Sequence, residues 1–131
     1  MKIGQTYTVK TVVDESNTAA AVASGGVPVF GTPMMIALME SAALQLASQY
    51  LEEGQTTVGT RIEVSHTAAT PIGMQVEATA KLEKIDGKLL TFSMTASDDA
   101  ELIGEGMQVR AIVNERKFID RTNSKLRPLC H

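Results

Sequence analysis

The segment Phe30–Tyr50 constrains the fold of this chain most strongly, because it places one carboxylate in the middle of a long apolar stretch. From Met34 to the end of the segment, that carboxylate, Glu40, is the one charged residue. Thr32 can cap a helix through its hydroxyl and Pro33 fits the first helical position, so we expect a helix that begins at about Pro33. Apolar or small residues occupy every side of this helix, which is typical of a helix surrounded by other structure.

Length and charge restrict the class of protein. With 131 residues, the chain can bury roughly two thirds of its unfolded surface, so we expect one domain over residues 1–131 that needs no metal or disulfide to fold. A net charge of -3 argues against a nucleic-acid surface. Glu40 and the short uncharged runs beside it argue against a membrane span. The single cysteine, Cys130, and a first segment without a signal peptide's apolar run lead us to expect a cytoplasmic protein.

Five segments alternate between apolar and polar residues and are therefore predicted to be strands. They are residues 3–13, 56–69, 74–85, 89–97 and 102–118. Thr70–Gly73 has the proline and glycine positions of a type I turn, and Asp86-Gly87 indicates a two-residue hairpin. Gly104 and Gly106, inside the last segment, indicate a bulge or a close approach by another backbone.

Two segments are not predicted to be strand or long helix. Residues 14–31 are rich in small residues and include Gly25-Gly26 and Pro28, so we expect a mobile loop with one helical turn at Thr18–Ala23. The tail from about Asp120 is expected to be poorly ordered.

One strand, one long apolar helix and an antiparallel meander of four strands predict an α+β fold of the hotdog type, in which a five-stranded antiparallel sheet wraps a long central helix. A single helix cannot cover five strands completely, and the long last strand leaves an edge to be paired. We therefore expect a homodimer that joins two sheets edge to edge.

Three polar residues are expected to converge in this fold: Thr32 at the helix start, Glu40 two turns later, and His66 on the inner face of the next strand. Thr32 and Glu40 are separated by about 12 Å along the helix axis, so the residues either contact one substrate or belong to sites that a second chain completes. Structural roles are the alternatives. Glu40 can pair with Arg61 or Arg110, His66 can be a hydrogen-bonded core residue, and Thr32 can serve as the N-cap alone.

This combination of residue types suits acyl transfer. A carboxylate can attack a carbonyl or activate water, an imidazole can transfer protons, and the N–H groups at a helix start can hold an oxyanion. Two histidines and one cysteine are too few for a zinc cluster, and the phosphate-binding, dinucleotide-binding and GxSxG motifs are absent from the sequence. We therefore expect no metal and no cofactor.

The runs FGTPMMIALMESA and VGTRIEVSHTAATPIG resemble the fluoroacetyl-CoA thioesterase family of single-hotdog enzymes. The similarity extends over about Val29 to Phe118, and HTAATPIG is its most specific part. The resemblance implies a homodimer that hydrolyses acyl-CoA thioesters without a metal or redox cofactor, coenzyme A being part of the substrate.

The resemblance also implies roles for individual residues. The residues matching the family's catalytic ones are Thr32, Glu40 and His66. Gly59 matches a glycine whose backbone N–H binds the thioester carbonyl, and Arg110 matches an arginine near the acyl site. Whether Glu40 acts as the nucleophile or as the base for water is left open.

One segment departs from the family. The fluoroacetyl-specific enzyme has phenylalanines that form a lid over the acyl group, whereas this chain has AVASGGVPVF, with Ala23 and Gly26 near those positions. Phe30 is the phenylalanine that remains as a candidate substrate contact. We therefore expect another acyl group, larger or more polar, in place of selectivity for fluoroacetyl-CoA.

Several alternatives stay open on sequence alone. Half of the chain's 12 basic residues lie between Arg110 and Arg127, and they either meet the phosphates of coenzyme A or form a solvated tail. Glu40 and His66 would also serve a hydratase or isomerase acting on an acyl thioester. A third possibility is a hotdog module that binds acyl-CoA without catalysis.

Overall fold

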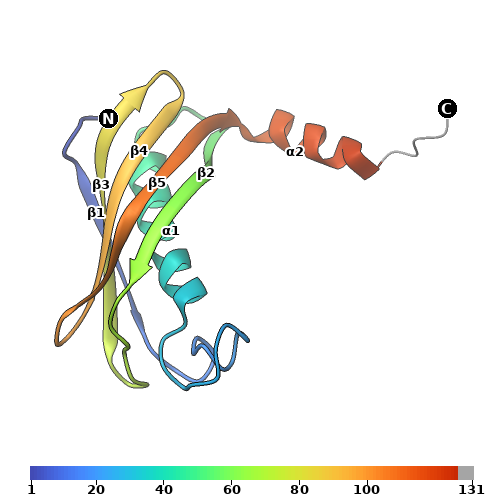
Figure 1. Ribbon diagram of the computed structural model, residues 1–131. Coiled ribbons are helices and arrows are strands. Elements are labelled where there is room, and N and C mark those ends of the chain that lie inside the picture. The colour runs from blue at the N-terminus through green and yellow to red at the C-terminus, as the bar shows by residue number, and fades with distance from the viewer. Residues whose placement is uncertain (127–131) are drawn as a thin grey trace.

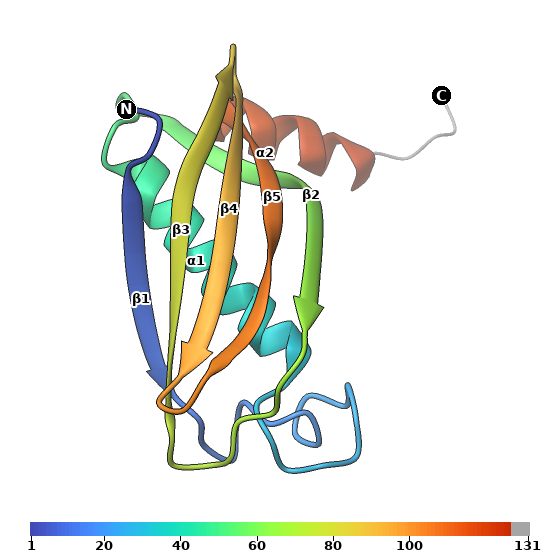
Figure 2. The same ribbon diagram turned by 60° about the vertical axis from the view of Figure 1, so that its left-hand side comes forward.

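The computed structural model describes residues 1–126 and contains five strands and two helices (Figure 1). In chain order these are β1 (Thr6–Val12), α1 (Thr32–Ser48), β2 (Gln55–His66), β3 (Gln75–Asp86), β4 (Leu89–Asp98), β5 (Leu102–Asn114) and α2 (Glu115–Asn123), followed by a 3-10 turn at Ser124–Leu126. All pairings are antiparallel, in the order β1-β3-β4-β5-β2, and α1 crosses one face of the sheet (Figure 2). The predicted α+β arrangement of one long helix on a five-stranded antiparallel sheet is confirmed.

The core lies between α1 and the adjacent strands β3 and β4. The predicted meander of four consecutive strands is wrong for β2, which pairs with β5 and not with β3. The buried residues of α1 are Met35, Met39, Ala42, Ala43, Leu46 and Ala47. They pack against the alternate residues of β3 and β4 that the sequence predicts to face inward, namely Val76, Ala78, Ala80, Leu82, Leu90, Phe92, Met94 and Ala96. Burial of these side chains supplies most of the driving force for folding.

Within residues 1–126 of a single chain, one side of α1 is left uncovered, so the helix is not buried on every side in one subunit. Ile36, Glu40 and Leu44 recur every four residues along this side and are all half-buried. Ala37 and Gln45, next to them, are exposed. The uncharged composition around Glu40 therefore belongs to a partly open surface of the helix.

The start of α1 differs from the prediction. The N-cap is Gly31, the helix begins at Thr32, and no side chain caps it. A Cβ on Gly31 would lie 3.2 Å from the backbone nitrogen of Ala19, so a larger N-cap residue meets the preceding loop. Thr32 is thus not the cap, because its hydroxyl bonds to His66 instead. Pro33 lies in the first turn, as predicted.

Two glycines of β5 permit a close approach, as their position in a strand indicates. A Cβ on Gly104 would lie 2.6 Å from Met35 Sδ and 2.7 Å from the carbonyl oxygen of Ser65. A Cβ on Gly106 would overlap the carbonyl oxygen of Glu63. The predicted close approach by another backbone is therefore confirmed at both positions.

Two turns are shifted by one residue from their predicted positions. The hydrogen bond from Met74 N to Pro71 O frames the first, so Gly73 occupies its third position with φ of 97°, where a type II turn requires glycine. In the second, Gly87 follows the paired residue Asp86 and begins the two-residue loop. The predicted type I turn at Thr70–Gly73 is therefore wrong.

The end of the chain contains a helix that the strand pattern did not predict. β5 ends at Asn114, whose side chain caps α2 by accepting a hydrogen bond of 2.9 Å from Lys117 N. This N-cap ends the strand before Phe118, so the predicted strand to residue 118 is wrong. The segment from residue 120, for which the sequence predicts poor order, continues α2 and the 3-10 turn as far as residue 126. Arg127 and Cys130 lie outside the described residues.

Within residues 1–126, neither helix combines the length and the apolar content needed to cross a bilayer.

The loop before α1 makes a helical turn, as predicted, with Val22 N donating to Thr18 O.

Candidate active site

Thr32 and His66 form the first part of the site. Thr32 lies in the first turn of α1 and His66 is the last residue of β2. A hydrogen bond of 2.8 Å joins Thr32 Oγ1 to His66 Nδ1. Within the described residues, His66 Nε2 is buried and has no hydrogen-bond partner. An imidazole with one fixed nitrogen and one unsatisfied nitrogen is poised to exchange a proton with a bound molecule.

A cavity of about 340 Å³ opens beside this pair. Apart from Thr32 and His66, it is lined by Ala19, Ser24, Gly25, Val27, Val29, Phe30, Thr67, Ala68 and Ala69. Phe30 is only 1% exposed, so it forms part of the fixed wall rather than a movable cover. The lining contains no lysine or arginine. This cavity therefore suits an uncharged group.

Glu40 forms the second part of the site. Its Oε2 accepts a hydrogen bond of 2.6 Å from Gln108 Nε2 and lies 3.6 Å from Arg110 Nη1. Both contacts use Oε2, and within residues 1–126 no hydrogen bond is made to Oε1. The predicted pairing with Arg110 is present, whereas Arg61 pairs with Glu63 at 2.6 Å. One carboxylate oxygen is thus anchored and the other is available, on a side chain that is 40% exposed.

Arg110 fixes this carboxylate through a buried network. Its Nε donates to Thr57 Oγ1 at 2.9 Å, its Nη2 to Thr57 O at 3.0 Å, and its Nη1 to Gln108 Oε1 at 3.1 Å. Burial lowers the pKa of Arg110, and the charge of Glu40 acts in the opposite direction. The guanidinium remains protonated at neutral pH, so it holds Gln108 in the orientation that donates to Glu40.

Gly59 places backbone directly beside Glu40. A Cβ at this position would lie 2.7 Å from Gln108 Nε2 and 3.2 Å from Glu40 Oε2. Gly59 pairs with Arg110 in the sheet, and a register shift follows it between Gly59 and Arg61. A second cavity, of about 250 Å³, is lined by Glu40, Gly59, Thr60, Arg61, Ile62 and Gln108. The glycine predicted to bind a carbonyl and the predicted carboxylate thus line the same cavity.

The structure brings the predicted residues together in two groups. Thr32 and His66 line one cavity, while Glu40 and Gly59 line the other. Gly59 and His66 are seven residues apart on β2, which corresponds to about 23 Å of extended strand. A single thioester carbon cannot contact both groups at that separation within one chain.

Gln108 and Thr57 are contacts of the site that the sequence did not single out. Gln108 is 1% exposed and Thr57 is 4% exposed. The available signal is their position, because Gln108 lies in the inward series of β5 that contains Gly104, Gly106 and Arg110. A polar amide at a buried strand position needs partners, and here the partners are Glu40 and Arg110.

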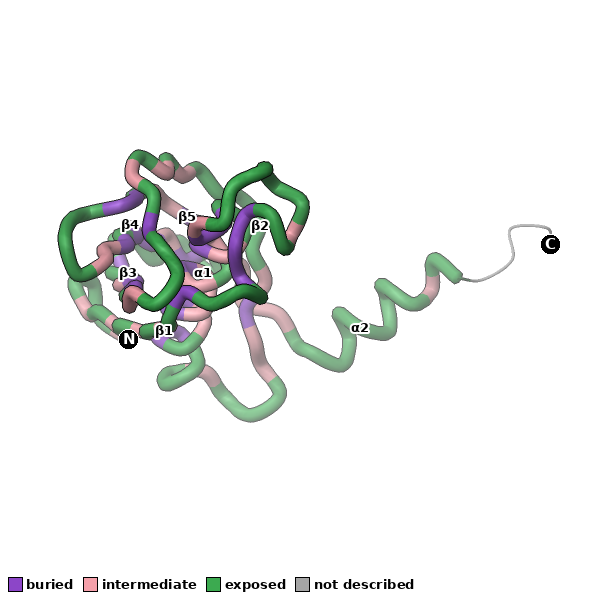
Figure 3. Tube along the Cα trace, turned by 90° about the horizontal axis from the view of Figure 1, so that it is seen from below, coloured by how far each residue is buried: buried purple, intermediate pink, exposed green. Residues whose placement is uncertain are grey.

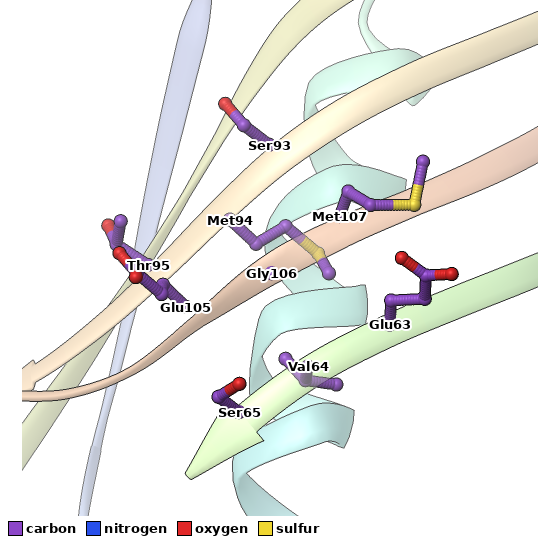
Figure 4. A pocket seen from close by; sticks show the side chains of 9 residues that line it. All are labelled: Glu63, Val64, Ser65, Ser93, Met94, Thr95, Glu105, Gly106 and Met107. Carbon is purple, nitrogen blue, oxygen red and sulfur yellow. The ribbon is translucent and has the colours of Figure 1, made fainter. Parts of the chain in front are cut away.

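A further hollow, of about 480 Å³, lies across β2, β4 and β5 (Figure 4). Its lining includes Glu63, Ser65, Glu105 and Met107 but none of the predicted site residues. Glu63 is already paired with Arg61. This hollow lacks the combination of nucleophile, base and oxyanion donor and is not the candidate site.

Comparison with solved structures identifies the class of protein. A crystal structure of the fluoroacetyl-CoA thioesterase FlK superposes with a TM-score of 0.91 at 34% identity, covering 98% of each chain. A hot-dog-like protein from Thermanaerovibrio acidaminovorans superposes with a TM-score of 0.88 at 24% identity, covering 96% of this chain and 93% of that one. The sheet and its helix are therefore a hotdog fold, as predicted.

The sequence comparisons identify the family. The model of the family described as fluoroacetyl-CoA-specific thioesterase matches residues 13–116. The fluoroacetyl-CoA thioesterase of Streptantibioticus cattleyicolor is 41% identical over 99 residues, which cover 76% of this chain and 68% of that protein. The chain belongs to this family and is a thioester hydrolase, so the resemblance inferred from its two sequence runs is confirmed.

Proposed function

We propose that this thioester hydrolase acts on acyl-CoA thioesters and that Glu40, His66 and Thr32 carry out the reaction. The observation that carries the proposal is the half-anchored carboxylate of Glu40 beside the backbone of Gly59. The relative FlK supports the choice of substrate, since the solved structures of its variants include one with fluoroacetate and CoA and one with acetyl-CoA.

Glu40 has two possible roles in this chemistry. As a nucleophile, Oε1 attacks the thioester carbonyl, the C–S bond breaks, and an acyl-glutamyl anhydride forms that water then hydrolyses. As a base, Oε1 takes a proton from a water molecule whose oxygen attacks the same carbon. A single turnover in isotopically labelled water separates the roles, because the nucleophile route puts one original Glu40 oxygen into the acid product.

The other groups handle protons and charge. In this step a doubly protonated His66 gives its Nε2 proton to the leaving thiolate and becomes neutral, while its Nδ1–H donates to Thr32 Oγ1, which holds the imidazole in position. The N–H of Gly59 stabilises the oxyanion that develops on the carbonyl oxygen. No metal or redox cofactor takes part in this proposal.

The site is completed by a second copy of the chain. β2 pairs with β5 on one side and is an edge strand on the other, and residues 59–63 of β2 are exposed. If two β2 strands pair antiparallel about a two-fold axis that passes between residues 62 and 63, Gly59 of one subunit lies beside His66 of the partner subunit. The half-buried stripe of Ile36, Glu40 and Leu44 then faces the partner. Each dimer contains two sites, with Glu40 and His66 coming from different subunits.

The loop before α1 supports a different acyl preference from that of the fluoroacetyl-specific relative. The residues that line the cavity from this loop include Ala19, Gly25 and Val27, and Phe30 is fixed in the core. Small side chains leave room that a fluoroacetyl group does not fill. We expect the ratio of kcat/KM for fluoroacetyl-CoA over acetyl-CoA to stay within about tenfold, since the walls offer no group that distinguishes the two.

The test is a thiol-release screen with short, branched, aromatic and fluorinated acyl-CoAs. We expect turnover of at least one acyl group larger than acetyl with kcat/KM above that for fluoroacetyl-CoA. Discrimination for fluoroacetyl-CoA by several orders of magnitude would contradict the acyl preference. Thiol release from none of the acyl-CoAs would contradict the proposed substrate class.

A further inference from the structure

The helix α2 lies outside the packed body of the chain. It follows β5 directly, and its first residue, Glu115, donates from its backbone N–H to Gly54 O at 2.9 Å. Asn114, the residue before it, pairs with Gln55 at the start of β2. From there α2 projects beyond the β2 edge, away from the sheet (Figures 1 and 3). No residue of α2 is buried.

The surface of α2 and the following 3-10 turn carries four cations, Arg116, Lys117, Arg121 and Lys125, against the two carboxylates Glu115 and Asp120, and it is partly apolar. Lys117 and Arg121 are four residues apart, and Lys125 continues the row in the 3-10 turn, so the three cations lie along one side. The ion pairs within residues 1–126 involve Lys10, Arg61, Lys81 and Arg110, and therefore no cation of α2. Two large apolar residues, Phe118 and Ile119, are 42% and 47% exposed. The helix thus offers positive charge and apolar surface that no residue of 1–126 pairs with or buries.

The Thr32–His66 cavity lacks the positive charge that a CoA thioester requires. Coenzyme A carries several phosphate groups, whereas the described residues that line this cavity include no lysine or arginine. The two arginines near Glu40 are already engaged, Arg110 with Thr57 and Gln108, and Arg61 with Glu63. Arg110 is thus held in its buried network and Arg61 in an exposed ion pair, so the cations of α2, which form no ion pair within residues 1–126, are better placed to bind phosphate.

The symmetry of the proposed dimer brings α2 of one subunit close to the Thr32–His66 cavity of the partner subunit. When two β2 strands pair antiparallel, the Gln55 end of one lies beside the His66 end of the partner subunit. α2 begins at this Gln55 end, four residues of β2 from Gly59, or about 13 Å along the strand. In coenzyme A the pantetheine arm likewise separates the thioester from the phosphates. α2 of one subunit therefore reaches the partner's site at the distance where phosphates are expected.

We propose that α2 binds the phosphates of the CoA thioester whose acyl group occupies the Thr32–His66 cavity of the partner subunit, through Lys117, Arg121 and Lys125. This inference rests on the proposed function and on the proposed dimer. It makes α2 a binding element that acts in trans, while the chemistry stays with Glu40 and His66.

The first test measures binding of coenzyme A and of pantetheine, which lacks the phosphates, by calorimetry. The variant Lys117→Gln/Arg121→Gln is expected to weaken CoA binding about tenfold and to leave pantetheine binding unchanged. Lys84→Gln/Lys88→Gln removes the same charge from the exposed β3–β4 hairpin and is expected to bind both molecules as the wild type does. Unchanged CoA binding by the α2 variant, or equal weakening in the control, would overturn the inference without affecting the thiol-release result.

The second test determines whether α2 binds the CoA thioester in the cavity of its own subunit or in that of the partner subunit. Two mixed dimers are purified with different tags, and KM is measured with the acyl-CoA that turns over fastest in the screen. In the first, one subunit carries His66→Ala and the other carries Lys117→Gln/Arg121→Gln, and we expect a wild-type KM. In the second, one subunit carries all three changes beside a wild-type subunit, and we expect KM to rise about tenfold. The reverse pattern would show that α2 serves its own chain's cavity and would overturn the trans arrangement.

Discussion

Replacing Glu40 by Gln is expected to lower kcat for thioester hydrolysis by about a thousandfold or more, because the amide can neither attack the carbonyl nor accept a proton from water. Gln keeps the size of the side chain, and its carbonyl oxygen can still accept the hydrogen bond from Gln108. The fold should therefore survive. Steady-state thiol release and thermal unfolding, measured on the same preparation, separate loss of chemistry from loss of structure.

Glu63→Gln is the matched control for this variant. Glu63 lies on β2, is exposed and pairs with Arg61. Its replacement by Gln also removes one negative charge, on the strand that Glu40 contacts through Gly59. We expect kcat within about twofold of wild type, since exposed ion pairs contribute little. Full activity in Glu40→Gln, or an equal loss in Glu63→Gln, would rule out Glu40 as the reacting carboxylate.

Replacing Gly59 by Ala is expected to lower kcat/KM by about a hundredfold. The new Cβ would meet Gln108 Nε2 at 2.7 Å and Glu40 Oε2 at 3.2 Å, so the 2.6 Å hydrogen bond between these two side chains has to break or shift. Glu40 then loses its position relative to the Gly59 N–H that is proposed to hold the oxyanion. We also expect the free energy of unfolding to fall by about 1–3 kcal/mol, as for other overpacked positions.

Gly26→Ala is the control for stability alone, because a Cβ at Gly26 meets no atom within 4 Å while the residue lies in the loop matched to the acyl lid. Denaturant unfolding of both variants separates the overpacking at Gly59 from a general cost of losing glycine, and thiol-release kinetics are compared between Gly59→Ala and the wild type. If Gly59→Ala were as active as wild type, the close approach of Gly59 to Glu40 would have no part in the reaction.

The layout of the fold follows from local patterns that the sequence displays. The alternation of Val76, Ala78, Ala80 and Leu82 fixes which face of β3 is buried, and the same holds for β4. The predictions of where an element begins or ends were wrong where one polar side chain had two possible hydrogen-bond partners. The Thr32 hydroxyl bonds to His66 rather than capping α1, and the Asn114 side chain ends β5 by starting α2. The partner of such a side chain depends on residues that are close in space but distant in sequence, and the alternation of apolar and polar residues does not reveal them.

The sequence singled out the residues proposed for the candidate site but did not show which of them line the same cavity. Residue type and family resemblance singled out Glu40, Gly59 and His66, and the geometry places Glu40 beside Gly59. Periodicity alone could not show that Gln108 links Glu40 to Arg110, because a buried amide in a strand has several possible partners. Nor could it show that Glu40 and His66 line separate cavities, which is a consequence of the length of β2.

The most direct test of a site shared between two subunits is the activity of a mixed dimer in which one subunit carries Glu40→Gln and the other His66→Ala. Each homodimer of these variants is expected to be inactive. In the mixed dimer, one site combines the intact Glu40 of one subunit with the intact His66 of the other, so we expect about half of the wild-type kcat per dimer. A mixed dimer as inactive as the two homodimers would contradict the shared site.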